Sequence, residues 1–145
     1  MLDQIQAIRK FNRFYTNFLG LLNETILDSP VTLAEGRILF EIYMLPNCNA
    51  KKLIGVLNLD RGYMSRVLKR LERIRLIERV TDPGDKRIRN LKLTKDGKLL
   101  MGIIDRDANN HIKGILKGIN SAERKMLIKA MGDIEKILAN RSIDP

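Results

Sequence analysis

Apolar residues recur at spacings of three and four along most of the chain, and this periodicity predicts amphipathic helices. The first predicted helix runs from Leu2 to about Leu27 and ends at a polar break that contains proline. Its apolar stripe consists of Ile8, Phe11, Tyr15, Phe18 and Leu22. A second helix begins near Thr32, which has capping-box spacing to Glu35, and ends before Pro46.

The next two predicted helices are close together in the sequence. A short helix follows a turn at 47–49, and a second turn at 58–60 separates it from a basic helix that runs from Arg61 to about Arg75. Asp60 is well placed to cap the basic helix, because an aspartate at this position accepts hydrogen bonds from the first turn. The basic helix has one apolar face, made of Met64, Val67, Leu68, Leu71 and Ile74.

The pattern then changes from helical to alternating. Residues 77–81 and 88–93 suit two strands, and the DPGD sequence at 82–85 is a strong turn signal between them. Leu91 and Leu93 alternate with Asn90 and Lys92, so one side of this hairpin should rest on the core.

Two further helices complete the chain. Thr94 is placed to cap a long helix from Lys95 to about Ile119, and Ser121 and Glu123 open the last one. Two short helices joined by a tight turn and followed by a basic hairpin form a winged helix-turn-helix. We therefore predict a mainly helical (α+β) chain, with a winged lobe at 31–96 between terminal helices at 1–30 and 97–145.

Positive charge is concentrated in the predicted winged lobe. The 145 residues have a formal net charge of +10 and a sequence pI of about 10.0. Residues 60–98 contain 13 Lys and Arg against six Asp and Glu, so they hold seven of the ten net charges. A nucleic acid or an anionic membrane is therefore the expected partner. The membrane is disfavoured, because the basic helix has a narrow apolar face without Trp or Phe anchors.

The outward face of the basic helix carries the candidate DNA contacts. In helix-turn-helix proteins the N-terminal part of the second helix reaches base edges in the major groove. Arg61 and Arg66 are therefore candidates for bidentate contacts to guanine, and Ser65 for a contact to a base or a phosphate. Gly62 lacks a side chain and would allow the backbone to approach the DNA closely.

Other basic residues are candidates for contacts to the DNA backbone or the minor groove. Lys69 and Arg73 lie further along the helix, where phosphates are the expected partners, while Tyr63 would either support the turn or contact the backbone. The predicted hairpin tip adds a narrow basic finger suited to a minor groove. Its basic residues are Lys86, Arg87 and Arg89, and Asp85 could hold the Arg87 guanidinium. The order of these elements favours DNA binding over an ordinary solvated face.

Catalytic and metal-binding chemistry has little support in the sequence. Cys48 is the only cysteine and His111 the only histidine, and neither lies in a recognisable motif. This supply is too small for a zinc cage, and no metal, cofactor or catalytic residue is expected. A single cysteine favours a reducing compartment, and neither a signal peptide nor a membrane span is apparent. We therefore expect a cytoplasmic, non-enzymatic protein.

Two stretches of the sequence resemble the MarR family. They are VTLAEGRILFEIY at 31–43 and AKKLIGVLNLDRGYMSRVLKRLERIRLIERVTDPGDKRIRNLKLTKDGK at 50–98. The most specific elements are Asp85-x-Arg87, Leu93-Thr94, Gly97, and the segment from Leu71-Glu72 to Leu76-Ile77-Glu78-Arg79. IRKFNRFYTNFLGLL and LDRGYMSR are similar to a subgroup in which the regulator is fused to an acetyltransferase, although no acetyltransferase half is present here.

The resemblance implies a transcriptional regulator, most often a repressor, that forms a homodimer through its terminal helices and binds a pseudo-palindromic duplex. By position, Arg61, Ser65 and Arg66 would contact the major groove and Arg87 the minor groove, with Asp85 bracing the wing. One departure is Arg75, which stands where the family usually has glycine, a residue that suits a left-handed helix end. Arg75 must either adopt that strained conformation or end the helix differently.

Family members often bind small phenolic or anionic effectors near the dimer helices. Candidate pocket residues in this chain are Phe11, Phe14, Tyr15, Phe18, Phe40 and Tyr43. Aromatic stripes at helical spacing are more typical of plain core, so core is the favoured interpretation. Redox sensing by Cys48 is also disfavoured, because the cysteine through which some family members sense oxidants usually lies elsewhere in the chain. Two alternative functions stay open: a non-specific architectural DNA binder, and the regulatory half of a fused acetyltransferase.

Overall fold

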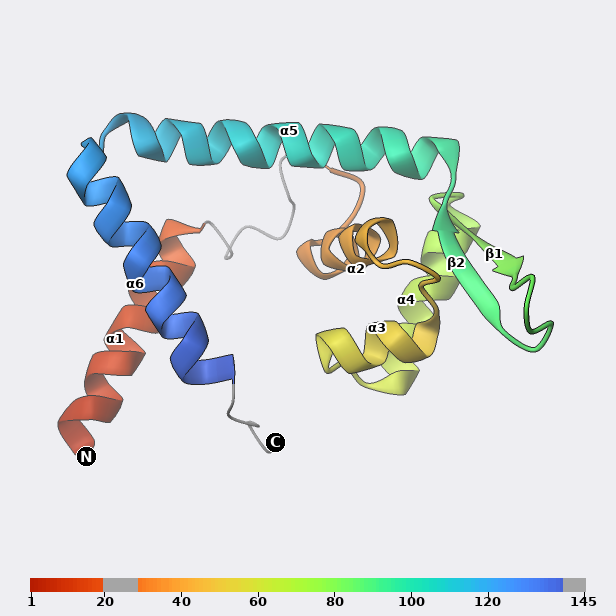
Figure 1. Cartoon of the computed structure of the whole chain (residues 1–145), viewed down its shortest axis with the longest axis horizontal. Coiled ribbons are helices and arrows are strands. Elements are labelled where there is room, and N and C mark those ends of the chain that lie inside the picture. The colour runs from red at the N-terminus through yellow and green to blue at the C-terminus, as the bar shows by residue number, and fades with distance from the viewer. Residues whose placement is uncertain (20–28, 140–145) are drawn as a thin grey trace. The chain divides into compact units, whose positions relative to one another are not determined.

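Figure 1 shows the computed structural model of the chain, in which residues 1–19 and 29–139 are described. In chain order the elements are α1 (Leu2–Phe18), α2 (Leu33–Met44), α3 (Ala50–Leu57), α4 (Arg61–Arg73), β1 (Ile77–Thr81), β2 (Arg89–Leu93), α5 (Lys95–Lys117) and α6 (Ser121–Ala139). This order confirms the predicted winged helix-turn-helix with long terminal helices. The chain divides into two compact units, Met1–Asp105 and Arg106–Pro145. The predicted boundaries at 30 and 96 remain predictions.

The hydrophobic core lies in the winged lobe of the first unit. It joins α2, α3, α4, both strands and Met101 of α5. Its largest fully buried side chains are Val31, Ile38, Leu39, Cys48, Leu53, Met64, Leu68 and Leu71. Each large apolar side chain buried in this way contributes about 1.5–3 kcal/mol to folding. The predicted inner face of α4 is therefore confirmed, except that Ile74 lies at the C-cap and is partly exposed.

Side-chain caps explain where the helices begin. The Thr32 hydroxyl accepts from the Glu35 N–H while the Glu35 carboxylate accepts from the Thr32 N–H, which is the predicted capping box. Asp60 accepts from the Tyr63 N–H at 2.8 Å and Thr94 from the Gly97 N–H at 3.0 Å, both as predicted. The last helix begins at Ser121 as predicted, and a second reciprocal pair, Asn120 with Glu123, caps it.

The terminal helices bury little within one chain. Neither α1 nor α6 has a buried residue, and their exposed apolar side chains include Ile8, Phe11, Phe14, Phe18, Met126, Ile128, Met131, Ile134 and Ile137. The predicted extension of the first helix to Leu27, including Leu22 in its stripe, lies outside the described residues. Over the described ranges no helix is long and apolar enough to cross a membrane.

The wing is a two-stranded antiparallel hairpin in which Ile77 pairs with Leu93 and Thr81 with Arg89. Leu91 and Leu93 are buried, as the alternation predicts. Asn90 departs from that alternation. It should face solvent because its neighbour Leu91 is buried, yet it is only 5% exposed. A hydrogen bond accounts for this: the Asn90 Nδ2 donates to the Oδ2 of Asp82, the first residue of the turn, at 2.7 Å.

The end of α4 shows how the chain accommodates Arg75. The Arg75 N–H donates to the Glu72 carbonyl and the Leu76 N–H to the Leu71 carbonyl, both at 3.0 Å, which is the Schellman pattern. Leu76 and Leu71 are both buried, supplying the apolar contact of that motif. Arg75 has a φ of 59°, so a non-glycine residue occupies the left-handed position. Arg75 therefore adopts the strained conformation, the first of the two alternatives predicted for it.

Arg75→Gly is therefore expected to stabilise the chain by about 1 kcal/mol, because glycine adopts a positive φ without a steric penalty. Chemical denaturation of the two proteins measures this difference. Arg75→Ala is the matched control and should give no such gain, since alanine keeps the Cβ. Equal gains in both variants would assign the effect to loss of the charge.

Candidate nucleic-acid interface

The outward face of α4 presents the cationic side chains that the sequence nominated. Its exposed residues include four cations and two small residues: Arg61, Arg66, Lys69 and Arg73, with Gly62 and Ser65. Tyr63 is partly buried and packs against the core, so its ring supports the fold of the lobe. Asp60 caps the helix through its Oδ2, and a Cβ at Gly62 would lie 3.0 Å from that oxygen and 3.5 Å from an Arg66 guanidinium nitrogen. Gly62 therefore leaves room for both side chains.

The charges on this face differ from those beside it in how they are paired. Within the described residues, Arg61, Arg66, Lys69 and Arg73 have no hydrogen bond or ion pair to another side chain. Their charged groups are therefore available to a polyanion. Arg70 and Arg79, by contrast, are engaged with carboxylates and hold α4 in place.

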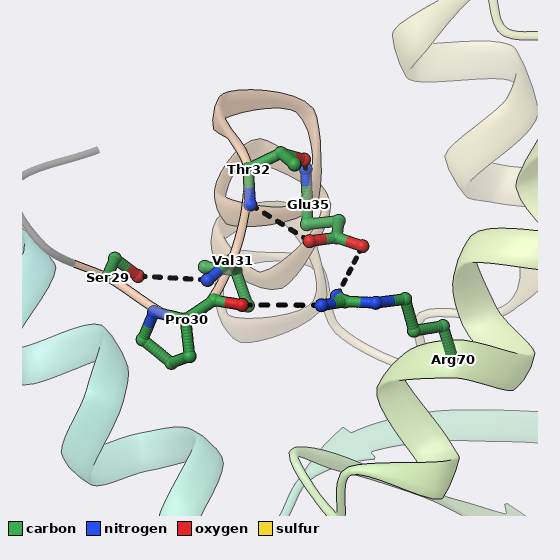
Figure 2. A network of polar contacts seen from close by, with 6 residues as sticks. All are labelled: Ser29, Pro30, Val31, Thr32, Glu35 and Arg70. Carbon is green, nitrogen blue, oxygen red and sulfur yellow. Dashed lines mark hydrogen bonds and ion pairs between the residues drawn. The ribbon is translucent and has the colours of Figure 1, made fainter. Parts of the chain in front are cut away.

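Arg70 ties α4 to the start of α2. Figure 2 shows its guanidinium between Glu35 and Pro30: Nη1 lies 2.6 Å from the Glu35 Oε1 and Nη2 lies 3.4 Å from the Pro30 carbonyl oxygen. The other Glu35 oxygen accepts from the Thr32 N–H at 2.9 Å. The Glu35 carboxylate is buried, and it is compensated by one arginine and one helix cap. This ion pair thus fastens the start of α2 to α4.

A second ion pair joins α4 to the wing. The Arg79 Nε and Nη2 donate to the two Glu72 oxygens at 2.8 and 3.3 Å, a bidentate geometry that favours one relative orientation. Arg79 lies on β1 and Glu72 on the last turn of α4. This pair orients the hairpin with respect to the helix.

At the wing tip the candidate arginines are braced. Arg87 donates from Nε and Nη2 to the two Asp85 oxygens, both at 3.1 Å, and its N–H donates to the same carboxylate at 2.9 Å. The side-chain bonds from Arg87 lower the pKa of Asp85 most, and the backbone bond lowers it further. Arg89 donates to the Thr81 hydroxyl at 2.8 Å, and Lys86 is exposed. Asp85 thus occupies the bracing position that the sequence indicated.

Asp82 forms the base of the tip. Its Oδ1 accepts from the N–H groups of Gly84 and Asp85 at 2.8 and 3.1 Å, and its Oδ2 accepts from Asn90. The Asn90 bond, followed by the two backbone bonds, lowers the pKa of Asp82. Since the pKa values of Asp82 and Asp85 are both lowered, these bonds persist at neutral pH and are lost only as the pH falls through the lowered values.

Sequence reasoning missed the role of several residues that hold this surface in place, among them Glu35, Arg70 and Asn90. Glu35 carries a local capping signal, but its ion pair reaches 35 positions along the chain. Arg70 is one of several cations on α4, and only its position between the inner and outer faces sets it apart. Asn90 sits in an alternating strand that gives no sign of its burial.

The aromatic side chains proposed for an effector pocket are not core within one chain. Phe11, Phe14, Phe18, Phe40 and Tyr43 are 38–62% exposed, and Tyr15 is partly buried. On α1 the rings stack on one another, with centroids 5.5 Å apart for Phe11 and Tyr15 and 6.1 Å apart for Phe14 and Phe18. The favoured core interpretation was wrong for the single chain, because α1 buries no residue and Phe40 and Tyr43 are exposed on α2. The pocket itself remains a prediction.

Cys48 is 1% exposed, and burial raises the pKa of its thiol; the nearby Lys52 lowers it to a smaller extent. Its carbonyl accepts from the Leu91 N–H at 2.7 Å, which joins the turn before α3 to the wing. Among the described residues no group of His, Cys, Asp and Glu is arranged to hold a metal ion.

The native thiol is therefore expected to react with an aromatic disulfide reagent at least about tenfold more slowly than the denatured chain at pH 8, since both thiolate fraction and access are reduced. Absorbance of the released thiolate measures the rate. Equal rates in the two states would show that Cys48 is accessible and reopen a redox role.

Comparisons with known proteins agree with this fold. The MarR family model matches residues 31–88. The chain is 26% identical to the HTH-type transcriptional regulator YybA of Bacillus subtilis over 117 residues, which cover 81% of this chain and 78% of that protein. It is 28% identical to the HTH-type transcriptional regulator BilQ of Clostridioides difficile over 113 residues, 74% of each chain.

Solved structures share the architecture over nearly the whole chain. The MarR family transcription regulator SP03579 has a TM-score of 0.74 at 28% identity, over 96% of this chain and 90% of that one. Streptococcus pneumoniae FabT in complex with DNA has a TM-score of 0.82 at 23% identity, over 94% and 98%. Bordetella bronchiseptica BpsR, whose DNA binding is regulated by 6-hydroxynicotinic acid, has a TM-score of 0.69 at 24% identity, over 90% of this chain and 98% of that one.

These likenesses agree with the prediction of a DNA-binding, non-enzymatic transcriptional regulator. The two sequence relatives are named as regulators alone. The similarity to acetyltransferase fusions therefore stays a prediction.

Proposed function

We propose that this chain is a member of the MarR family, whose model matches its winged helix-turn-helix, and that it is a sequence-specific repressor that binds a pseudo-palindromic DNA site as a homodimer. The observation that carries the proposal is the division of the cations of α4 and β1 into free and paired ones. A row of exposed, unpaired cations faces outward, while Arg70 and Arg79 hold the helix to α2 and to the wing. A rigid helix with free cations on one face suits the major groove.

In this proposal the residues of α4 divide by role along the helix. Arg61, Ser65 and Arg66, near the N-terminus, contact base edges, and Gly62 gives the backbone room to approach. Lys69 and Arg73 contact phosphates further along the groove. The wing enters the adjacent minor groove with Arg87, supported by Lys86 and Arg89, because the narrow groove has a strongly negative potential.

The exposed apolar faces of the terminal helices support the homodimer. Monomeric proteins rarely leave large apolar patches in water. A second copy that covers these faces would place two α4 helices about 34 Å apart, one turn of the duplex. Sedimentation at micromolar concentration tests this step, and a monomer would contradict it.

A small aromatic acid is the effector class that we propose for release from DNA. The aromatic residues of α1 and α2 leave exposed ring faces, and BpsR offers a precedent among similar structures, since a hydroxynicotinic acid regulates its DNA binding. Its site would lie beside the dimer helices, where Phe11, Phe14, Tyr15, Phe18, Phe40 and Tyr43 are the candidate residues.

Selection of bound sites from a random duplex pool tests the function as a whole. At about 0.15 M salt, where non-specific attraction is weakened, we expect enrichment of an inverted repeat with half-sites one turn apart. Recovery of a pool with no preferred sequence would overturn specific regulation in favour of an architectural DNA binder.

A further inference from the structure

Asn90 is a polar residue at a buried position of the hairpin, where an apolar side chain would serve the core equally well. Asn90 pairs with Val80 across the hairpin and is 5% exposed. Its Nδ2 donates to the Asp82 Oδ2 at 2.7 Å, while its Oδ1 has no hydrogen-bond partner within the described residues. An unpaired buried acceptor costs about 1–3 kcal/mol. The benefit of an amide at this position must therefore come from its donor.

From Asp82 the bonds continue outward to the wing tip. The Asp82 Oδ1 accepts from the N–H groups of Gly84 and Asp85. The backbone closes the same loop, because the Asp82 N–H donates to the Ile88 carbonyl at 3.0 Å and the Ile88 N–H to the Asp85 carbonyl at 2.9 Å. Asp85 then holds Arg87 through its N–H and its guanidinium. A continuous chain of bonds runs from the buried amide to an exposed arginine.

We propose that Asn90 is a positioning residue for DNA binding: it fixes the rotamer of Asp82, which fixes the turn and so aims Arg87. The proposal rests on the proposed function, in which Arg87 enters a minor groove. Without Asn90 the Asp82 carboxylate would keep its two backbone donors, Gly84 and Asp85, on one oxygen, while water would solvate the other, so the side chain would be held from one side only. Arg87 would then bind DNA from a wider set of positions, at an entropic cost.

Asn90→Leu separates positioning from stability. Leucine keeps an uncharged side chain of similar size and removes the unpaired acceptor, so the unfolding midpoint should stay close to that of the parent chain. Affinity for the duplex recovered by site selection should nevertheless fall about tenfold, the order of coupling seen between residues in one hydrogen-bond network. Fluorescence anisotropy at about 0.15 M salt measures this loss.

A swap of the two side chains supplies the rescue. Asn90→Asp alone sets two carboxylates against each other at the base of the wing, so it should weaken binding at least as much as Asn90→Leu. Combining it with Asp82→Asn restores one donor and one acceptor across the same contact, and binding should recover. This rescue also covers the case in which Asn90→Leu fails to fold, because the swapped chain keeps the polar pair.

A double-mutant cycle with Arg87→Ala decides whether Asn90 acts through the tip. If it does, Asn90→Leu loses its effect once Arg87 is gone. Independent losses that multiply, or full affinity in Asn90→Leu, would overturn the positioning role while leaving the regulator intact. If Arg87→Ala binds as tightly as the parent, Asn90 has nothing to aim and the inference falls. Failure of the parent chain to select any sequence would instead be a failure of the proposed function.

Discussion

Gly97→Ala is expected to destabilise the folded chain by about 3 kcal/mol or more, a loss typical of severe steric conflict in a core. A Cβ on Gly97 would lie 2.0 Å from the Leu76 carbonyl oxygen and 3.0 Å from its carbon. Both atoms belong to the backbone, so no side-chain rotation relieves the clash. The carbonyl is also fixed, because it accepts from the Thr94 N–H at 3.1 Å. Urea denaturation followed by circular dichroism measures the change.

Gly102→Ala is the matched control on the same helix, α5. No heavy atom lies within 4 Å of its hypothetical Cβ, so alanine should stabilise the helix by about 1 kcal/mol through its higher helix propensity. The two substitutions are chemically identical and should differ in sign. A stability for Gly97→Ala equal to that of the parent would show that the start of α5 is not packed against Leu76 as described.

Arg70→Met is expected to cost about 2–3 kcal/mol, less than a fully buried pair because the arginine side chain is 39% exposed. The Glu35 side chain is 7% exposed and would lose its only cationic partner within the described residues (Figure 2). Its bond to the Thr32 N–H remains, but a buried carboxylate without a counter-charge is unfavourable. The unfolding free energy measures the loss.

Two controls separate the pairing from the arginine itself. Arg73→Met removes an exposed, unpaired cation from the same helix and should change stability by less than about 0.5 kcal/mol. Glu35→Gln combined with Arg70→Met removes both charges and should recover most of the loss, because a neutral amide still accepts from the cap N–H. If the double variant is as unstable as Arg70→Met alone, the loss comes from packing and not from the ion pair.

Local signals in the sequence were enough to predict most of the lobe. The inner face of α4 follows from a helical spacing of apolar residues, and the Asp60, Thr32 and Thr94 caps follow from side-chain chemistry within three residues. The exposed cations of α4 follow from the same wheel, since whatever is opposite Leu68 and Leu71 must face away from the core. These features depend on spacing alone.

Features that depend on distant partners could not be predicted in the same way. The Glu35–Arg70 pair joins elements that only the packing of α2 on α4 brings together. The buried Asn90 donates to Asp82, a carboxylate eight residues earlier in the chain, and a strand pattern holds no information on that contact. The aromatic residues of α1 have the spacing of a core helix, yet within the described residues none of them is buried. Their burial depends on what binds them.

The most direct test of the account compares two substitutions on α4 against two duplexes, the selected site and a shuffled one, over a range of salt concentrations. We predict that Arg66→Met lowers the affinity ratio between the duplexes by about tenfold or more, since a bidentate base contact carries specificity. Lys69→Met should weaken binding to both duplexes equally, and it should reduce the slope of log affinity against log salt concentration by about one. An unchanged ratio in Arg66→Met would contradict the claim that the outward face of α4 distinguishes one DNA sequence from another.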